Sequence, residues 1–371
     1  METFKRMILV FCLLTLSVGI LSCDYSFHKM KDDADDKPEE EVSAVLYVIS
    51  EKSIVAKCNI VEDELVLQNE YKIENGVANL EIHPGRNLYA INNKSVNMFN
   101  IDQETGDIVF NQSLDISEDI NAAYSINSTI SPAGDALFLC NEHNLLVVDL
   151  SSDGMTNLRT PATYSDTDNY PLVHHNSYYL YVHTASHVVK NSIIDENFLI
   201  YVDSTVFGAF ITNPIMRHDQ KTVYGILENN ISYNFFAYRV ENDGAEIKPL
   251  NSGSGAGFYN LGSGELYSSD LHPGGQFLYI ASSDTASGYI NIYAINSDGS
   301  INTTEVSTVK TLMSIRHIKV IPGEITYLVA SCTSGNTLIL WQIEDDGTLR
   351  HLDRINSIIE PSDIKYQQGD L

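Results

Sequence analysis

Residues 272–301 read HPGGQFLYIASSDTASGYINIYAINSDGSI, and this stretch decides the fold. It contains an apolar run built around an aromatic residue, a polar turn, a second alternating run and an Asp-Gly pair. Short runs rich in β-branched and aromatic residues, bounded by turn residues, are typical of strands. Asp-Gly is typical of tight hairpins because glycine accepts a positive φ. The stretch therefore predicts antiparallel strands joined by hairpin turns.

The same pattern recurs along the whole chain of 371 residues. Seven apolar runs follow one another at intervals of 42 to 55 residues, beginning at Leu46, Leu88, Leu137, Leu180, Val223, Leu278 and Tyr327. Repeats of this length indicate stacked β units that cannot bury their faces alone. We predict an all-β, seven-bladed β-propeller over residues 44–371. An open β-solenoid is the alternative.

The two ends of the repeat region are complementary in their strand patterns. The first repeat is incomplete, since Leu46 to Leu67 supplies two strands and little precedes them. After the last repeat, residues 358–366 read IIEPSDIKY, which is a further strand pattern. An open ring would leave sheet edges free to pair with other chains. We therefore predict that the C-terminal strand pairs with the N-terminal strand and closes the ring.

The N-terminus reads as a targeting segment. A basic start precedes the apolar residues 7–21, which are too few for a mature membrane span. The sequence Ile-Leu-Ser-Cys at 20–23 resembles the lipobox of bacterial lipoproteins, which implies a signal peptide over 1–22 and lipidation of Cys23. An ordinary secretory signal with an incidental cysteine is the alternative. Residues 23–43 are acidic and predict a disordered tether. The resemblance implies a lipid anchor in the bacterial cell envelope, on the outer membrane or the periplasmic face.

Composition limits the partners. The chain has 22 basic and 49 acidic residues and a net charge of −27, which repels phosphate backbones, so we expect no nucleic-acid partner. Beyond the signal and the lipidation site, Cys58, Cys140 and Cys332 remain, without the spacing of a zinc site. We interpret them as small buried hydrophobes. We expect no metal, no cofactor and a monomer.

The repeats resemble those of the seven-bladed lactonase propellers, a family that includes bacterial 6-phosphogluconolactonase and fungal carboxymuconate-cyclising enzymes. The similarity spans residues 44–366. The segments that carry it are HPGRNLYAINNKSVNMFNIDQETGDI at 83–108, SPAGDALFLCNEHNLLVVDL at 131–150, LHPGGQFLYIASSDTASGYINIYAI at 271–295 and IRHIKVIPGEITYLVASCTSGNTLILWQIEDDGTL at 315–349. The tail at 358–366 resembles the family's closing strand.

The resemblance also implies a site. In catalytic members, His, Glu and Arg side chains of adjacent blades converge on one end of the channel, to move a proton and to hold an anionic substrate. Two of these signatures are present here: Glu228 matches the family's Asn-Glu, and Arg316 and His317 match its Arg-His. Four others fall on residues without the expected charges, namely 167–169, 184–186, 211–213 and 282–283.

Alternative interpretations remain for the individual residues. His187, with Asp203, would replace the missing histidine of the fourth blade in a shifted register, but even spacing favours His187 on a later strand of that blade, with a turn at 195–197. Glu228 has the alternative of a solvated loop carboxylate, and Arg316 and His317 that of a blade-packing ion pair or a strand-end hydrogen bond. The histidines at 174, 175 and 183 lack a carboxylate at metal-ligand spacing.

These observations favour a lipid-anchored, lactonase-like propeller that is catalytically degenerate and binds a small molecule or a protein at its channel face. The alternative is a 6-phosphogluconolactonase-like hydrolase that acts on a sugar-acid lactone with Glu228, Arg316 and His317. A third hypothesis is an extracytoplasmic sensor or a subunit of a surface assembly.

Overall fold

The computed structural model describes most of the chain from Val42 onward, and Val42–Leu371 forms one compact unit. The described residues are 42–83, 87–119, 126–131, 133–141, 144–151, 154–163, 170–173, 179–183, 187–195, 198–206, 210–228, 234–241, 246–250, 258–261, 264–284 and 287–368. For part of the strand residues between 161 and 258, only the backbone is described. The proposed signal peptide, Cys23 and the acidic tether lie outside the described residues.

The described strands form seven antiparallel sheets, named A to G. The innermost strands, in the order of sheets A to G, are β29 (Ile364–Gln368), β4 (Asn79–His83), β8 (Asn127–Ile130), β12 (Tyr170–Val173), β16 (Phe210–Met216), β21 (Glu265–Leu271) and β25 (His317–Ile321). The second strands are β1 (Val42–Ser50), β5 (Asn87–Ile91), β9 (Ala136–Cys140), β13 (Tyr179–His183), β17 (Thr222–Glu228), β22 (Phe277–Ser283) and β26 (Tyr327–Cys332).

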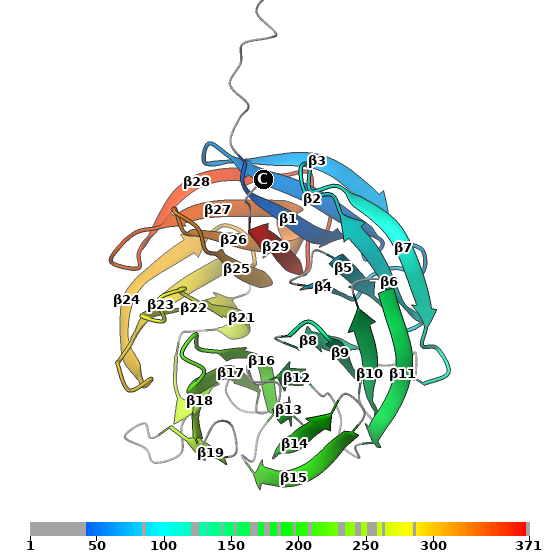
Figure 1. Ribbon diagram of the computed structural model, residues 1–371. Helices are drawn as coiled ribbons and strands as arrows, with labels where there is room; N and C mark the ends of the chain where they lie inside the picture. Colours follow the sequence, from blue (N-terminus) through cyan, green and yellow to red (C-terminus); the bar gives the residue numbers. More distant parts are fainter. Residues whose placement is uncertain are drawn as a thin grey trace, which may run out of the picture. The chain divides into compact units, whose positions relative to one another are not determined.

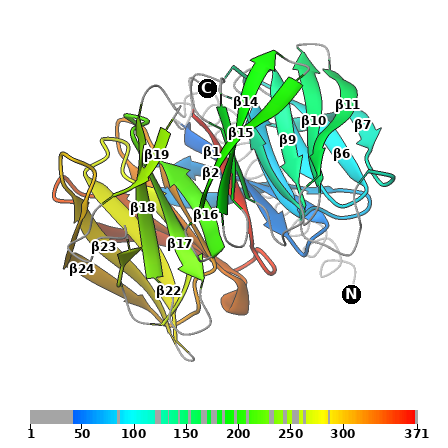
Figure 2. The same ribbon diagram turned by 90° about the horizontal axis from the view of Figure 1, so that it is seen from below.

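The two outer layers follow the same order. The third strands are β2 (Ile54–Val61), β6 (Ser95–Ile101), β10 (Asn144–Ser151), β14 (His187–Asp195), β18 (Asn234–Glu241), β23 (Gly288–Ile295) and β27 (Thr337–Ile343). The outermost strands are β3 (Glu64–Lys72), β7 (Ile108–Asp115), β11 (Gly154–Thr163), β15 (Phe198–Val206), β19 (Glu246–Pro249), β24 (Ile301–Thr311) and β28 (Leu349–Ile355). A short strand, β20 (Phe258–Tyr259), pairs with β18, and a 3₁₀ turn, η2, spans Thr333–Gly335. In Figure 2, paired strands such as β23 and β24 run side by side.

The sheets are arranged in a ring, with the innermost strand of each sheet nearest its centre (Figure 1). Each innermost strand contacts the innermost strands of the two neighbouring sheets, and β29 contacts both β25 and β4. The hydrophobic core lies between the faces of adjacent sheets: one cluster joins sheets G and A, for example, and another joins A and B. The predicted all-β propeller is confirmed, and the open solenoid is wrong.

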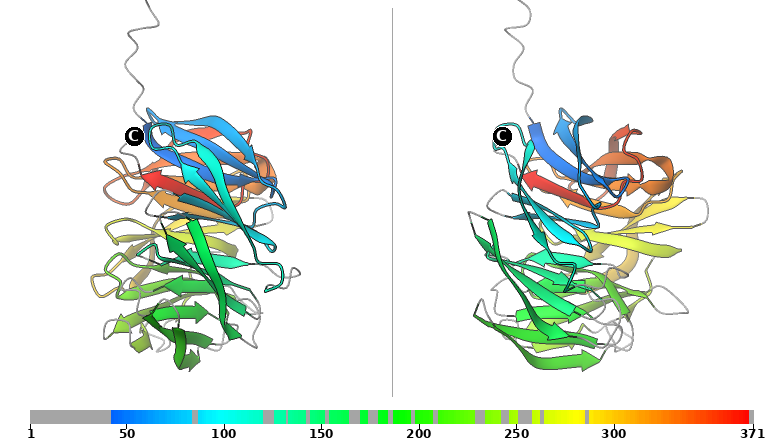
Figure 3. Two further views of the ribbon diagram at one scale, coloured as in Figure 1. Left: turned by 45° about the vertical axis from the view of Figure 1, so that its right-hand side comes forward. Right: turned by 90° about the vertical axis from the view of Figure 1, so that its right-hand side faces the viewer.

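Ring closure uses both ends of the repeat region, as predicted. β29 is the innermost strand of sheet A and pairs with β1, in a register that places Leu46 opposite Tyr366 and Val48 opposite Ile364. Figure 3 shows the red β29 beside the blue β1. The predicted strand count of the first repeat is wrong, because residues 42–72 supply three strands instead of two. The third, β3, was missed because its outer position leaves it largely exposed and only residues 65–67 of it form an apolar run.

Buried tyrosines link neighbouring sheets. The Tyr47, Tyr224 and Tyr279 hydroxyls donate hydrogen bonds to the carbonyl oxygens of turn glycines in the next sheet, at 2.7, 2.7 and 3.1 Å. The acceptors are Gly106, Gly299 and Gly347, whose φ values of +70°, +87° and +83° favour glycine. This contact explains why an aromatic anchor and a glycine turn recur with the same period in the sequence.

We expect Tyr224→Phe to lower the free energy of unfolding by about 1–2 kcal/mol, because it removes a buried hydrogen bond and leaves the Gly299 carbonyl without its donor. Chemical denaturation of the two proteins measures this difference. Tyr89→Phe is the matched control, because the Tyr89 hydroxyl is equally buried and donates to no turn carbonyl among the described residues. Equal losses in both variants would contradict the role of the tyrosine–glycine contact.

Candidate functional site

A polar cavity of about 270 Å³ lies in the channel between the innermost strands. Its wall comes from β4, β8, β16, β21, β25 and β29, so that six of the sheets contribute. The lining residues are Asn79, Glu81, Asn127, Ser128, Thr129, Asn213, Pro214, Ile215, Ser268, Ser269, Asp270, His317, Ile318, Lys319, Asp363, Ile364 and Lys365. Alternation along a strand sends every second side chain to one face, and on β25 it separates His317 and Lys319 from the buried Ile318 and Val320.

Two lysines of the channel are paired with carboxylates. Lys365 Nζ lies 3.3 Å from Glu81 Oε2, and Lys319 Nζ lies 3.0 Å from Asp270 Oδ2. The carboxylates are held in turn, because the Ser128 hydroxyl donates to Glu81 at 2.9 Å and the Val320 amide donates to Asp270 at 2.9 Å. Both lysines are therefore committed to partners within the wall.

His317 forms a third pair with Asp363. Its Nε2 lies 3.4 Å from Asp363 Oδ1, and the Leu80 amide donates to the other carboxylate oxygen at 2.9 Å. Burial lowers the pKa of His317, and the neighbouring Asp363 offsets only part of that effect. The imidazole is therefore predominantly neutral at pH 7.

The pKa values of Asp363, Glu81 and Lys365 depend on burial and on the charges of one another. Burial opposes the charge of Asp363, but Lys365 and His317 outweigh it and hold the pKa of that carboxyl below its usual value. Burial raises the pKa of Glu81. For Lys365, burial opposes the charge, yet Glu81 and Asp363 raise its pKa above the ordinary value. The cluster is thus a set of interdependent charges in which Lys365 stabilises two carboxylates.

We expect Asp363→Asn to lower the pKa of His317 further, because the substitution removes the charge that favours the imidazolium form. Titration of the His317 ring protons by NMR in both proteins measures the shift. His272 is the internal control. Burial lowers its pKa as well, but its hydrogen-bond partner is Gln276 and not Asp363, so the substitution does not remove its partner. A higher or unchanged pKa of His317 in the variant would contradict the pairing.

The structure separates the two neighbouring residues Arg316 and His317. His317 lines the cavity, whereas Arg316 is exposed and its guanidinium lies 4.1 Å from the ring centre of Tyr267, a cation–π contact. Asn213 Nδ2 donates to the Tyr267 carbonyl at 2.8 Å. Tyr267 was missed in the sequence because nothing local marks it as a partner of a residue on the next sheet.

Glu228 is the last residue of β17, opposite Phe210 at the start of β16. His317 is the first residue of β25. All innermost strands run in the same direction through a propeller, so the backbones of Glu228 and His317 lie at the same end of the channel. The Glu228 side chain is outside the described part of the structure.

Other residues occupy positions where the family resemblance predicts charge. Ser282 and Ser283 are buried, and the Ser314 hydroxyl donates to Ser283 at 2.9 Å, which fastens the segment before Arg316. Residues 167–169 and 184–186 lie outside the described residues, as do His174 and His175.

The backbone of sheet D decides the register of the fourth repeat. His187 begins β14, the third strand, and Asp195 pairs with Phe198 across the predicted turn. Asp203 lies on β15, at the opposite edge of the sheet from the innermost strand. The register that placed His187 and Asp203 at the channel is therefore wrong.

The cysteines behave as predicted. Cys58, Cys140 and Cys332 are buried in strands, and burial raises the pKa of Cys58 to about 12. Within the described ranges, no group of three or more His, Cys, Asp or Glu side chains is placed to hold a metal. No helix in the described part of the chain has the length and apolar character required to cross a membrane.

Five charged residues of the channel wall were not predicted from the sequence as candidate functional residues: Glu81, Asp270, Lys319, Asp363 and Lys365. A signal existed, because charges alternate with apolar residues in RHIKVI at 316–321 and in SDIKY at 362–366. Such alternation in a strand that is innermost in its sheet predicts a charged channel wall.

Comparisons with known proteins agree with this architecture. No family model matches the chain, and no curated protein matches it in sequence. Among solved structures, a Bacteroides uniformis protein provisionally described as a 6-phosphogluconolactonase matches with a TM-score of 0.68 and 14% identity, over 88% of this chain and 100% of its own. A Lactobacillus plantarum protein matches with a TM-score of 0.71 and 13% identity, and a functionally unknown protein from Desulfotomaculum acetoxidans with 0.68 and 11%, both over the same shares of the two chains. The chain therefore has the fold of the lactonase-like β-propellers.

Proposed function

We propose that this protein is a lipid-anchored, lactonase-like propeller of the bacterial cell envelope that binds a ligand at its channel face and is catalytically degenerate, without the hydrolytic activity that its resemblance to the lactonase family implies. The observation that carries the proposal is the pairing of the channel lysines, Lys319 with Asp270 and Lys365 with Glu81. Each cation that faces the described cavity is neutralised by the wall itself.

The pairing matters because an anionic lactone needs cations that are free to meet it. Binding a phosphate or carboxylate here would require a lysine to leave a partly buried carboxylate, which costs free energy. His317 adds no permanent charge because its pKa is lowered. Asn213, Ser268 and Ser269 supply neutral polar groups to the same wall. The wall thus has three carboxylates against two paired lysines, so it suits a polar ligand without negative charge, or a protein loop with such side chains.

The second candidate is a lactone hydrolase. It is favoured by the His317–Asp363 pair, in which a fixed carboxylate orients a neutral imidazole suited to accept a proton. Glu228 lies at the same end of the channel by its backbone position, and Arg316 would meet the substrate only by leaving Tyr267. This mechanism requires the three residues of the resemblance to converge on one substrate.

Hydrolysis of 6-phosphoglucono-δ-lactone and glucono-δ-lactone by the full-length protein distinguishes the two candidates. The binding function predicts no turnover above the spontaneous rate. Turnover that is lost in Glu228→Gln and His317→Ala, and kept in the exposed control Glu344→Gln, would establish the hydrolase instead.

The anchor has its own test. In cells that process lipoproteins, we expect the wild-type protein in the membrane fraction and Cys23→Ala in the soluble fraction, because acyl chains supply the membrane affinity. Retention of Cys23→Ala in the membrane fraction would contradict lipidation at that residue.

A further inference from the structure

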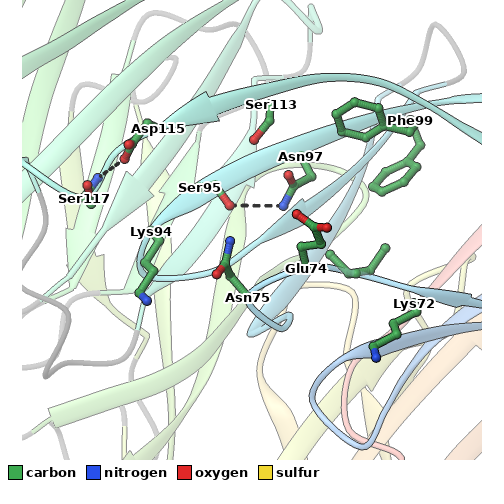
Figure 4. A pocket seen from close by; sticks show the side chains of 12 residues that line it. Lys72, Glu74, Asn75, Lys94, Ser95, Asn97, Phe99, Ser113, Asp115 and Ser117 are labelled. Carbon is green, nitrogen blue, oxygen red and sulfur yellow. Dashed lines mark hydrogen bonds between the residues drawn. The ribbon is translucent and has the colours of Figure 1, made fainter.

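A second cavity, of about 570 Å³, lies on the outer flank of sheet B, away from the channel. Its wall comes from the end of β3 and the loop that follows it, from the start of β6 and from β7. Figure 4 shows Asn75, Ser95 and Asn97 close together in this wall, with Phe99 beside them. The volume falls in the range of small-molecule sites.

The walls of this cavity are fastened to one another. Asn92 Oδ1 accepts hydrogen bonds from the amides of Lys94 and Ser95, at 2.8 and 2.9 Å, and Asn92 Nδ2 donates to the Gly76 carbonyl at 2.9 Å. The Ile116 amide, just after β7, donates to the Lys94 carbonyl at 2.8 Å. The loop after β3, the β5–β6 turn and the end of β7 therefore form one preorganised frame, which lowers the cost of binding.

An aromatic surface forms part of the wall. Phe99 is 7% exposed and meets Phe110 edge to face, with ring centres 5.8 Å apart. Phe110 is 57% exposed although its ring adjoins the cavity. An exposed phenyl ring fixed against a buried one, beside polar amides and hydroxyls, offers an apolar face next to hydrogen-bonding groups.

The charges around the cavity balance. Lys72 and Lys94 line it together with Glu74 and Asp115, and the Asp115 carboxylate accepts a hydrogen bond from the Ser117 amide at 2.9 Å. In a chain of net charge −27, a site with equal numbers of positive and negative side chains is locally neutral. This balance favours a ligand without net charge.

We propose that this cavity binds a neutral saccharide. A pyranose ring has an apolar face of C–H groups, which fits against the Phe110 ring, and an edge of hydroxyls that can donate to and accept from the Asn75 amide. The Asn97 Nδ2 already donates to Ser95 Oγ at 3.2 Å, so Asn97 offers its Oδ1 as an acceptor. The lysines and carboxylates at the rim provide further donors and acceptors. This site is separate from the channel, and the inference does not depend on the function proposed for the channel.

The test is titration of the full-length protein with maltose, cellobiose and chitobiose, followed by calorimetry and by NMR of the protein. We expect at least one disaccharide to bind and Phe110→Ala to weaken its binding about tenfold, the loss of one aromatic contact. Val109→Ala is the matched control: Val109 is the preceding residue of β7, is 62% exposed and points to the opposite face. We expect Val109→Ala to bind as the wild type does.

Three results would overturn the inference. One is the absence of binding by all three disaccharides at several millimolar. Another is equal weakening by Phe110→Ala and Val109→Ala, which would show a general effect on β7. The third is binding that His317→Ala removes and Phe110→Ala leaves intact, which would place the saccharide in the channel. Circular dichroism of each variant verifies that the fold is retained.

Discussion

Ile364→Ala is expected to lower the free energy of unfolding by about 3–4 kcal/mol, the largest effect we anticipate from a single apolar truncation. Ile364 is fully buried and belongs to the cluster that joins sheets G and A. It begins β29, the strand that closes the ring, and pairs with Val48 of β1. A cavity at this position weakens the packing of the first sheet on the last.

Chemical denaturation with two independent probes measures this loss. The control is Ile359→Ala, which removes the same atoms from the same C-terminal segment at a position that is 43% exposed. We expect the control to change the free energy of unfolding by less than about 1 kcal/mol. Comparable losses in both variants would mean that β29 does not close the ring in solution.

Lys365→Met is expected to lower the free energy of unfolding by about 3 kcal/mol at pH 7, because it leaves two carboxylates without their cation. Lys365 contacts Glu81 at 3.3 Å, and its charge also holds the pKa of Asp363 down. The side chains of Lys365 and Glu81 are only 28% and 14% exposed, so water compensates poorly for the lost partner.

The loss of unfolding free energy in Lys365→Met should decrease as the pH falls. Burial already raises the pKa of Glu81, and removal of Lys365 raises it further because that lysine opposes the shift. A carboxyl whose pKa is higher in the folded state than in the unfolded state destabilises the fold at pH values above its folded-state pKa. This destabilisation decreases as the pH falls and is absent below the unfolded-state pKa. The difference between wild type and variant is therefore greatest near pH 7 and smaller near pH 4.

A double-mutant cycle separates this pair from the general effect of losing a lysine. Glu81→Gln combined with Lys365→Met should be more stable than Lys365→Met alone, since no charge is left at position 81. Lys248→Met is the surface control, because Lys248 and Glu241 are 56% and 34% exposed; we expect a loss below about 1 kcal/mol. The ion-pair interpretation would be refuted if Lys365→Met lowered the free energy of unfolding by the same amount at every pH, and equally with and without Glu81→Gln.

Local sequence patterns determined the architecture. Alternation with period two, aromatic anchors and glycine turns each depend on neighbouring residues, and they predicted strands and hairpins throughout the repeats. The strand that closes the ring was predicted as well, since a further strand pattern after the last repeat needs a partner. Where the local signal is weak, as in the polar outer strand β3, the prediction failed.

The candidate site was predicted only in part. The sequence pointed to Arg316 and His317 as a unit, and the structure divides them between Tyr267 and the channel. Nothing in the sequence connects His317 with Asp363, although the alternating charges at 362–366 marked the strand that brings Asp363 there.

The sequence by itself thus determined that this chain folds into β modules and that its last strand returns to its first. The tertiary structure alone decided which charges neutralise one another. Lys365 and Glu81 are 284 residues apart in the chain and meet because ring closure places β29 beside β4. Strand patterns are short-range properties of a chain, whereas the charge balance of a channel depends on every strand that lines it.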